Sequence, residues 1–396
     1  MDLLENPIRA YAWGSHTAIA GLQGRPTPTP QPEAELWLGA HPDSPSAVQV
    51  FSRRVPLPEV IAADPTGVLG AAAVARFGPR LPFLMKVLAA AQPLSLQAHP
   101  DTAQAVAGYA AEAAAGLAAD DPGRNYRDPY HKPELLVAVS GFDALCGFAD
   151  PADSAQLLAG LDVPALLSTV EALRGPDPAV ALRTAVTGLM RLAGADREHL
   201  VDAVVGASAV RGGPAAGLVA ELGQRYPGDI GVVVALLLNR VRLAPGEAVW
   251  MPAGNLHAYL CGTGVEIMAA SDNVLRGGLT PKHVDVPELL RVLRFEVLAD
   301  PVVRPQPVRP GLVTWATGVD EFVLHRATLG GADPAGGPDR VELPGDGPRI
   351  VFCLTGAVRV DDGAGAVMLR GGQAGFAPAG RTAVVTGTGV VFQASC

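Results

Sequence analysis

Two polar side chains stand two positions apart in a segment whose other residues are mostly apolar. Gln97 and His99 belong to the sequence SLQAHPD, which follows the apolar run LPFLMKVLAAAQPL. On a β-strand, residues two positions apart point to the same face, so Gln97 and His99 would project side by side. Burying two polar groups is costly unless something binds them. The pattern therefore predicts a shared binding partner at this strand.

Two further stretches carry groups of matching chemistry. Glu134 ends the sequence DPYHKPE and precedes the apolar run LLVAV, with Lys132 two positions earlier. His257 lies in the pattern PGExxxxPAGxxHAY, which resembles the metal-binding strand pair of cupin barrels. In small barrels, inward-facing side chains come close enough to share one ion. We therefore expect four side chains to meet at one metal ion: Gln97, His99, Glu134 and His257.

This set of side chains has the chemistry of a divalent metal site. Two imidazoles and a carboxylate suit zinc and other first-row divalent ions. The amide oxygen of Gln97 is a neutral and weaker donor, so the set supplies a single negative charge. An ion held in this way stays a strong Lewis acid toward a sugar oxygen or a water molecule. The simpler alternative is that each histidine only satisfies local hydrogen bonds.

The elements that would position these residues are mainly β-strands. Clusters of turn residues separate short strand-like segments in residues 1–100, and β patterns return after the middle of the chain. Between 150 and 228, Leu/Ala-rich segments have apolar residues every three to four positions, and several begin with Asp or Asp-Pro. This pattern predicts helices. Another helix is predicted over residues 101–120.

These patterns predict a mainly β protein with a helical insertion, built from two cupin-like (jelly-roll) β-barrels and an α-helical domain. At 396 residues, the chain is too long for one small core. We expect a catalytic cupin-like barrel from 1–149 and 229–310, and a helical insertion at 150–228. Residues 311–396 would form a C-terminal cupin-like β domain without metal ligands.

An internal repeat favours two related β units. The segments LAPGEAVWMPAGNLHAY, starting at Leu243, and LRGGQAGFAPAGRTAVV, starting at Leu369, share a leucine, two glycines and a Pro-Ala pair at the same offsets. His257 falls opposite Ala383, so only the first copy is expected to carry chemistry. Chance agreement in a chain rich in glycine, proline and alanine is the alternative.

Composition excludes several classes of protein. Hydrophobic residues make up 49% of the chain and charged residues 17%, which predicts a folded protein. A net charge of −9 argues against nucleic-acid binding. The four cysteines form no CxxC pair, so no disulfide framework is expected. Neither a signal peptide nor a stretch long enough to cross a bilayer stands out, and we expect a cytoplasmic protein that binds no membrane.

Several longer motifs occur in order from about residue 10 to about residue 300: YAWGS, LWLGAHPDSPS, SLQAHPD, DPYHKPE and PAGNLHAYLCGTGVEIMAASDNVLRGGLTPK. Together they closely resemble the type I phosphomannose isomerases. The resemblance implies a zinc enzyme that interconverts mannose 6-phosphate and fructose 6-phosphate. We expect one ion per chain and a monomer. It places the zinc ligands at the same four positions that residue chemistry indicates. Tyr130 departs from the family, which often has asparagine before HKPE.

An aldose–ketose isomerisation must move a proton between C2 and C1 and stabilise charge on the enediol oxygens. Lys132 would lie close to the positive ion and be partly desolvated, and both effects favour a neutral amine that can act as a base. The resemblance also points to Lys132. Glu266, on the strand after His257, competes for the same role.

Other residues are expected to contact the substrate. Arg276, in SDNVLRGG, looks like the family's active-site arginine, and a guanidinium group suits a phosphate or an enediolate oxygen. Lys86 lies inside an apolar strand, so it is expected to bind phosphate or line the site, unless it extends to solvent. Asp272 would assist ring opening or, alternatively, cap a turn. Trp13 and Tyr259 would line the sugar pocket or belong to the core.

The remaining histidines receive a structural interpretation. His131 is expected to point away from Lys132 if that segment is extended. The others have no evident partners at metal-binding spacing: His16, His41, His199, His283 and His325.

Two other functions stay open on the sequence alone. His99, His257 and Glu134 could hold iron as the facial triad of a cupin-type oxygenase, although the basic residues favour a phosphorylated substrate. A non-enzymatic sugar-binding or structural protein would fit a second barrel without metal ligands. That alternative leaves the convergence of four ligand-type side chains unexplained.

Overall fold

The chain is mostly β, with two large antiparallel sheets and about 12 helices, in a computed structural model that describes residues 1–396 except 51, 119, 214 and 333–336. We call the first 11-stranded sheet the site sheet. Its main path runs β14 (Val302–Val303), β11 (Ala248–Met251), β8 (Glu134–Ala138), β12 (His257–Ala269), β6 (Phe83–Ala90), β3 (Glu35–Gly39) and β2 (Ile8–Arg9). Four strands join this path at its side: β7 (Leu96–Ala98), β13 (Leu275–Gly278), β9 (Phe142–Phe148) and β10 (Leu238–Leu243).

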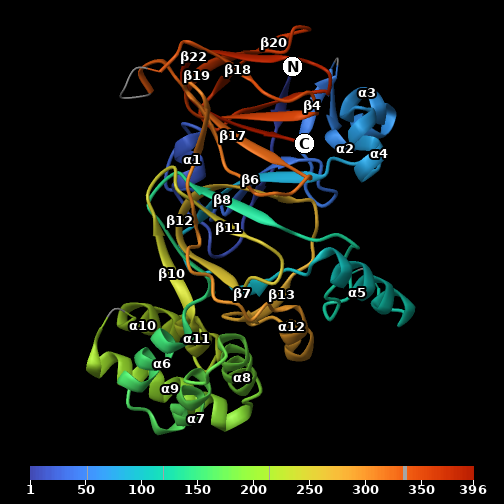
Figure 1. Ribbon diagram of the computed structural model, residues 1–396. Helices are drawn as coiled ribbons and strands as arrows, with labels where there is room; N and C mark the ends of the chain where they lie inside the picture. Colours follow the sequence, from blue (N-terminus) through green and yellow to red (C-terminus); the bar gives the residue numbers. More distant parts are fainter. Residues whose placement is uncertain (51, 119, 214, 333–336) are drawn as a thin grey trace.

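The second sheet, which we call the distal sheet, also has 11 strands. Its path runs β15 (Gln306–Arg309), β16 (Leu312–Thr314), β17 (Val323–Leu329), β22 (Ala383–Ser395), β19 (Arg349–Asp361), β21 (Ala374–Ala377), β1 (Asp2–Glu5), β4 (Ala47–Val50) and β5 (Arg53–Pro56), with β18 (Arg340–Leu343) on β22 and β20 (Ala366–Arg370) on β19. Strands from both ends of the chain therefore share this sheet, which lies at the top of Figure 1.

One face of the site sheet packs against the distal sheet. Phe83 and Met85 of β6 belong to the same buried cluster as Phe352 of β19 and Phe392 of β22. Each such side chain contributes roughly 1.5–3 kcal/mol when it leaves water. Because side chains alternate along a strand, Lys86 points away from this apolar layer. The opposite face of the site sheet is therefore the one that carries polar residues.

A β-bulge in β12 keeps the polar residues of that long strand on one face. Tyr259 pairs with Ala144 of β9, but Cys261 pairs with the preceding residue Asp143, so Leu260 is an extra residue. An extra residue reverses the alternation of side chains that follow it. The hydroxyl group of Tyr259 consequently reaches Oε1 of Glu266, at 2.7 Å, although the two residues are an odd number of positions apart.

The repeat predicted from the sequence is confirmed by the strands. β11 and β12 begin and end at the same positions of the repeat as β21 and β22. The glycines of the two shared turns also match: Gly246 and Gly372 have φ values of 93° and 80°. Such angles are in the left-handed region that favours glycine, so both copies need it there. His257 and Ala383 each begin the long strand that follows.

The Leu/Ala-rich segments predicted as helices are helical. They form α6 (Pro151–Gly160), α7 (Leu167–Leu173), α8 (Pro178–Met190), α9 (Gly194–Arg211) and α10 (Ala216–Arg225), at the bottom of Figure 1. The Asp-Pro starts act as expected, because Asp150 Oδ1 accepts a hydrogen bond from the Ala152 amide at 2.7 Å.

The other helices are α1 (Ala18–Leu22), α2 (Leu57–Ala63), α3 (Pro65–Leu69), α4 (Ala71–Phe77), α5 (Thr102–Ala114), α11 (Gly231–Val234) and α12 (Val286–Val292). The sequence placed a helix at 101–120, but α5 stops at Ala114. Gly116 has φ of 76°, and the Leu117 amide donates to the Glu112 carbonyl at 3.1 Å. This left-handed glycine ends the helix.

The helices of the α6–α10 segment pack against β7. Leu96 and Ala98 of β7 are buried in the same cluster as Leu158 and Leu182. Gln97 lies between them and so points to the other face, as the sequence predicts. Within the part of the chain that the structure describes, no helix is both long and apolar enough to cross a lipid bilayer.

Candidate metal centre

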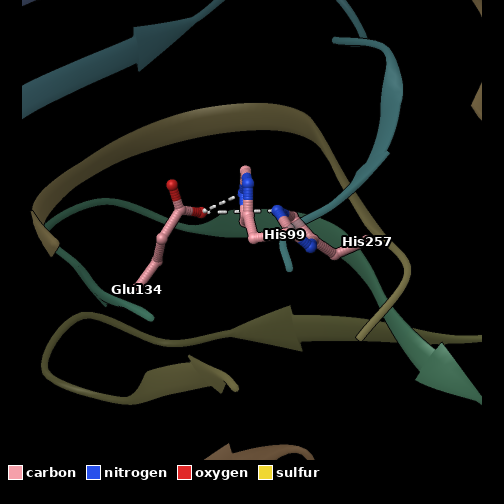
Figure 2. Close-up of side chains that lie close together, drawn as sticks. All are labelled: His99, Glu134 and His257. Carbon is pink, nitrogen blue, oxygen red and sulfur yellow. Dashed lines mark ion pairs between the residues drawn. The ribbon is translucent and has the colours of Figure 1, made fainter. Parts of the chain in front are cut away.

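Three strands bring three ligand-type side chains to one point. His99 follows the last residue of β7, Glu134 begins β8 and His257 begins β12. All three side chains are almost completely buried, at 1%, 2% and 0% exposure. Figure 2 shows both imidazoles pointing toward the Glu134 carboxylate. The convergence predicted from the sequence is therefore present for these three residues.

The spacing of the three ligand atoms fits a shared ion. His99 Nε2 and His257 Nε2 each lie 3.4 Å from Glu134 Oε2. Tetrahedral zinc with ligand bonds of about 2.0–2.2 Å separates its ligand atoms by roughly 3.3–3.6 Å. Among the described residues, these three atoms are buried without a hydrogen-bond partner. Unsatisfied buried polar groups are costly, and one divalent ion would satisfy all three.

Gln97 belongs to the same row of side chains. It pairs with His257 of β12 on one side and with Arg276 of β13 on the other. Directly opposed residues in antiparallel strands point to the same face. Gln97, His257 and Arg276 therefore share the polar face of the site sheet, next to the three converging ligand atoms.

Backbone carbonyl groups orient both imidazoles for metal binding. His99 Nδ1 lies 2.7 Å from the Asn273 carbonyl oxygen, and His257 Nδ1 lies 3.0 Å from the Asn255 carbonyl oxygen. A carbonyl can only accept, so each Nδ1 carries the proton and donates. Each Nε2 then presents a lone pair, as a metal ligand requires.

The electrostatics favour the ionised form of Glu134 and the neutral form of His99. Burial alone would raise the pKa of Glu134, but His99, Lys132 and His257 outweigh it and hold this pKa well below its ordinary value. Burial lowers the pKa of His99, against the opposing charge of Glu134. An ionised carboxylate and neutral imidazoles are the forms that bind a metal.

Lys132 contacts the Glu134 carboxylate from the side opposite the imidazoles. Its Nζ lies 3.2 Å from Glu134 Oε1, and the residue is 8% exposed. The neighbouring His131 instead forms an ion pair with Glu321 at 2.7 Å. The prediction that His131 and Lys132 point in different directions is thus confirmed, and the buried amine lies one contact from the ion position.

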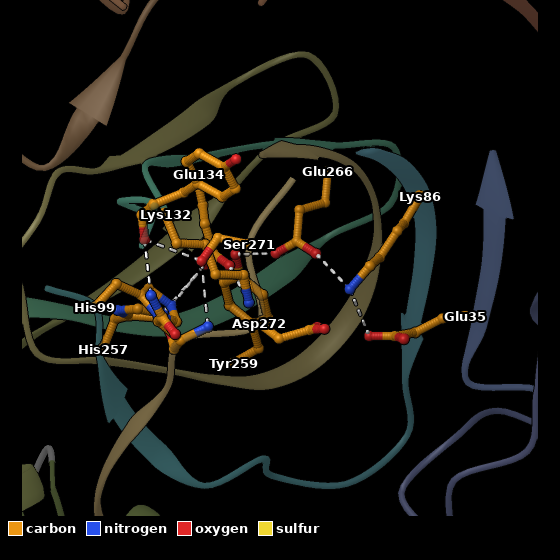
Figure 3. A network of polar contacts seen from close by, with 12 residues as sticks. Glu35, Lys86, His99, Lys132, Glu134, His257, Tyr259, Glu266, Ser271 and Asp272 are labelled. Carbon is orange, nitrogen blue, oxygen red and sulfur yellow. Dashed lines mark hydrogen bonds and ion pairs between the residues drawn. The ribbon is translucent and has the colours of Figure 1, made fainter. Parts of the chain in front are cut away.

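A second buried group of charges lies farther along the same face (Figure 3). Lys86 Nζ is 3.6 Å from Glu35 Oε1 and 4.0 Å from Glu266 Oε2. Burial opposes the charge on Lys86, but these carboxylates outweigh it and raise its pKa. Lys86 therefore does not extend to solvent. The anions that it contacts are two glutamates of the protein itself.

Glu266 is held partly protonated near neutral pH. Burial and then the charge of Glu134 raise its pKa from 4.5 to about 7, although Lys86 and the Tyr259 hydroxyl oppose this. Burial, together with Glu266, also raises the pKa of Tyr259 well above its ordinary value. The network of Figure 3 thus contains one carboxyl group that exchanges protons in the physiological range.

This raised pKa predicts a pH-dependent stability of the metal-free protein. Between about pH 4.5 and about pH 7 the unfolded chain ionises at Glu266 while the folded chain keeps the proton, so folding is disfavoured as pH rises. In urea unfolding, wild type should lose stability relative to Glu266→Gln across this window, by at most ~1.4 kcal/mol per pH unit. If the difference in unfolding free energy between wild type and Glu266→Gln did not change with pH, the raised pKa of Glu266 would be contradicted.

Asn273 ties together the segments that carry the ligands. Its backbone carbonyl accepts from His99, and its side-chain Nδ2 donates to the carbonyl groups of Asp128 and Tyr130 at 2.7 and 2.8 Å. Its Oδ1 accepts from the Arg127 amide at 2.7 Å. The residue is fully buried. One side chain therefore fixes the segment that leads to Glu134 relative to the loop that orients His99.

Replacement of Asn273 by alanine should weaken metal binding. The side-chain bonds to the 127–130 segment are lost, and loss of an outer partner of a metal site costs about 10- to 100-fold in affinity. Zinc affinity measured by competition with a chelator checks this. Asn6→Ala removes the acceptor of the Ser46 hydroxyl bond on another part of the chain and serves as the control. If Asn273→Ala bound zinc as tightly as wild type, the Asn273 side chain would not help to position the ligands.

A group of cations lies beside the ligand row. Burial, and then the charge of Arg127, lower the pKa of Arg276. Burial, followed by Arg276 and Arg127, also lowers the pKa of Lys282. Neighbouring cations that lower one another's pKa by repulsion favour the binding of an anion between them. Trp13, by contrast, packs at the edge of the buried cluster that contains Tyr259, stacked on Tyr11.

Sequence reasoning missed several of these residues. Asn273, Arg127 and Lys282 have no special spacing from the ligands, although Asn273 and Lys282 lie within the SDNVLRGGLTPK motif. The exclusion of His41 was wrong: it lies within ligand distance of Asp43 and Asp272, 3.1 Å from the Asp272 carboxylate. Its partner is 231 positions away, and a separation of this size hides such pairs from pattern analysis.

A buried His–Glu–His centre on the polar face of a β-sheet is a site that can hold one metal ion, and the comparisons with known proteins give its class. Residues 1–150 match the model of the phosphomannose isomerase type I catalytic domain. The mannose-6-phosphate isomerase of Escherichia coli is 38% identical over 97% of this chain and 96% of its own. The chain belongs to the type I phosphomannose isomerase family.

Further relatives agree over the full length. The mannose-6-phosphate isomerase of Salmonella typhimurium is 37% identical and covers 98% of both chains. A crystal structure of a zinc-bound mannose 6-phosphate isomerase has a TM-score of 0.91 at 36% identity, over 100% of this chain and 98% of that one. The Salmonella enzyme bound to fructose 6-phosphate and zinc has a TM-score of 0.91 at 34% identity, over 100% and 99%.

Proposed function

We propose that this protein interconverts mannose 6-phosphate and fructose 6-phosphate through an enediol intermediate, with one zinc ion per chain. The observation that carries the proposal is the meeting of His99 Nε2, His257 Nε2 and Glu134 Oε2 in a buried site, where none of the three has a hydrogen-bond partner among the described residues. Family membership at 38% identity supports the same reaction, and the Salmonella relative is bound to both fructose 6-phosphate and zinc.

We assign four residues to the zinc ion: Gln97, His99, Glu134 and His257. When bound, zinc supplies a Lewis acid that stabilises negative charge on the C1 and C2 oxygens of the sugar. Glu134 provides the only formal negative charge of the four, and Asn273 and Asn255 keep the imidazoles in the binding tautomer. The low exposure of these residues excludes bulk water from the reacting end of the sugar.

Proton transfer between C2 and C1 is assigned to Lys132. Its amine lies 3.2 Å from Glu134, so it is near the carbon atoms of any sugar whose oxygens face the ion. Glu266 is the competing residue, since its pKa of about 7 suits acid–base catalysis. Lys86 lines the site and keeps a positive charge next to Glu266, while Trp13 and Tyr259 form apolar walls of the sugar pocket.

Binding of the phosphorylated sugar is assigned to the cations near the ligand row. Arg276 shares the face of Gln97 and His257, and its guanidinium group can hold a phosphate or an enediolate oxygen in two parallel hydrogen bonds. Arg127 adds positive charge to the same region. Asp272, whose side chain is 41% exposed, supplies a carboxylate for proton transfers during ring opening.

The larger organisation follows as a further part of this proposal. Each sheet would be a cupin-like jelly roll, with the catalytic barrel in residues 1–149 and 229–310, the helical insertion at 150–228 and the metal-free domain at 311–396. β1 pairs with the C-terminal strand β21, and β4 and β5 follow β1 in the same sheet, which extends the last unit into the N-terminal chain. We further propose a monomer that acts in the cytoplasm.

A coupled assay tests the function directly. Fructose 6-phosphate formed from mannose 6-phosphate is measured before chelation, after chelation and after zinc is added back. We expect activity that disappears with the metal and returns with zinc. Oxygen consumption by an iron-loaded protein without isomerase activity would favour the oxygenase alternative instead.

A further inference from the structure

His41, which is buried, and Asp272, which is partly exposed, form a pair beside the metal centre. His41 lies two residues after β3 and is 7% exposed. Its Nε2 lies 3.1 Å from both carboxylate oxygens of Asp272. Neither residue is among the four zinc ligands, and His41 has no part in the mechanism assigned above. The pair therefore needs its own explanation.

The hydrogen bonds of His41 fix where its proton is. Nδ1 lies 3.2 Å from the backbone nitrogen of Asp43, which can only donate a hydrogen bond. Nδ1 must therefore be the unprotonated acceptor, and the ring proton is on Nε2. Nε2 then donates to the carboxylate of Asp272, so Asp272 is held as the ionised acceptor. A neutral imidazole in this tautomer serves only as a directed donor.

The imidazole ring cannot turn away from this position easily. It packs edge-to-face on Trp37 of β3, with ring centres 4.9 Å apart. Trp37 is itself fixed, because its Nε1 donates to Glu35 Oε2 at 2.7 Å and Lys86 Nζ lies 4.8 Å from its ring centre. The strand β3, which carries Glu35 next to Lys86, thus also sets the orientation of His41.

Asp272 is anchored at its backbone and open at its side chain. Its amide donates to Asp128 Oδ2 at 2.8 Å, and the next residue is Asn273, whose carbonyl orients His99. The carboxylate lines a cavity of about 340 Å³ together with His41, Asp128 and Tyr130. A carboxylate has about four acceptor sites, and the single donor from His41 leaves the others free toward this cavity.

Other charges surround the pair without replacing His41. Lys132 and Lys86 act on Asp272 through space, after burial and the direct bond to His41. Asp43, Arg80, Arg127 and Asp128 also border the pair or its cavity. Both carboxylate oxygens of Asp128 are already occupied, by Ser271, Tyr130 and the Asp272 amide. Of the two aspartates that line this cavity, Asp272 is therefore the one whose carboxylate can accept further hydrogen bonds.

We propose that His41 is a positioning residue that aims the ionised carboxylate of Asp272 at the sugar bound beside the metal centre, where it accepts a hydrogen bond from a sugar hydroxyl group. The proposal rests on the isomerase function proposed above and assigns no zinc ligand to His41. Loss of the His41 donor would let the Asp272 side chain rotate, and a misplaced catalytic group costs rate without loss of the metal.

The test compares two substitutions of His41 in the full-length zinc-loaded protein. His41→Leu removes the donor, whereas the side-chain amide of His41→Gln can reach to the place of Nε2. We expect kcat/KM for mannose 6-phosphate to fall about 10- to 100-fold in His41→Leu, as for loss of an orienting partner, and to recover most of this loss in His41→Gln. Zinc content should stay at one per chain in both. His199→Leu, an exposed histidine of α9, is the control.

A double-mutant cycle with Asp272→Asn separates positioning from general packing. If His41 acts only through Asp272, adding His41→Leu to Asp272→Asn should lower kcat/KM by less than about twofold. Fully additive losses, or equal losses in His41→Leu and His41→Gln, would overturn the proposal. So would a second zinc ion that His41→Leu removes, because the three residues His41, Asp43 and Asp272 would then be a metal site. Failure of the proposed isomerase function would be recognised separately, because wild type itself would then lack isomerase activity.

Discussion

Replacement of Glu134 by alanine should leave the protein without bound zinc and without isomerase activity. Glu134 supplies the only formal negative charge among the assigned ligands, and its Oε2 is the atom that both imidazole Nε2 atoms face at 3.4 Å. The loss in zinc affinity should exceed the about 10- to 100-fold that loss of an outer partner costs. Metal content after dialysis and the coupled assay measure the two effects.

The same substitution leaves a buried cation without its partner. Lys132 Nζ lies 3.2 Å from Glu134 Oε1, and removing one member of a buried pair typically costs about 3–5 kcal/mol. Glu134→Ala should therefore also unfold at lower temperature. Glu342→Ala, on an exposed position of β18, is the matched control and should change none of these quantities. Retention of one zinc ion per chain in Glu134→Ala would exclude the proposed centre.

Replacement of Lys132 should have the second large effect, with the opposite result for the metal. Lys132→Met keeps the three converging ligand atoms and should keep zinc, but it removes the amine assigned to proton transfer. General acid–base catalysis contributes about 10²- to 10⁴-fold, so kcat should fall by that amount. Single-turnover assays in D₂O, with deuterium read at C1 of fructose 6-phosphate, report the proton step itself.

Lys132→Arg distinguishes charge from proton transfer. An arginine keeps the positive charge next to Glu134 but does not give up its proton in proteins. We expect Lys132→Arg to bind zinc and to be nearly as inactive as Lys132→Met. If Lys132→Met keeps its rate within about tenfold of wild type, below the usual contribution of a general base, the proton is carried by another group. Glu266 would then be the first residue to substitute.

The convergence of His99, Glu134 and His257 could be predicted because the signals in the sequence are local. Gln97 and His99 are two positions apart on one strand, and alternation alone places them on one face. The strand β7 confirms this, since Leu96 and Ala98 are buried on the other side. Glu134 and His257 each begin a strand within a recognisable motif. The longer motifs then led to the family, which the full-length relatives confirm.

The supporting residues could not be predicted, because their partners are distant in the chain. His41 and Asp272 are 231 positions apart, and Asn273 contacts Asp128 from 145 positions away. Hydrogen bonds of this kind depend on how strands are ordered in a sheet, and a single sequence does not contain that order. The pairing of β1 with β21 and β4 escaped prediction for the same reason.

Burial also changed the meaning of residues that had been recognised. Lys86 was expected to face an anion, and the anions it faces include two glutamates of the protein. Glu266 could be named from its place after His257, but its raised pKa comes from burial and from Glu134. Chemical type was therefore predictable from the sequence, whereas charge state required the packed structure.

The extra residue at Leu260 has a consequence for how this gene can vary. Tyr259 and Cys261 already pair with the adjacent residues Ala144 and Asp143, so deleting Leu260 would leave both pairs, and the faces of the residues that follow, unchanged. Deleting Val265, in the regular part of the strand, would instead move Glu266 into the position of Val265 and turn its carboxyl group into the apolar layer between the sheets. In a library of single-codon deletions, active clones should therefore occur at Leu260 and be absent at Val265.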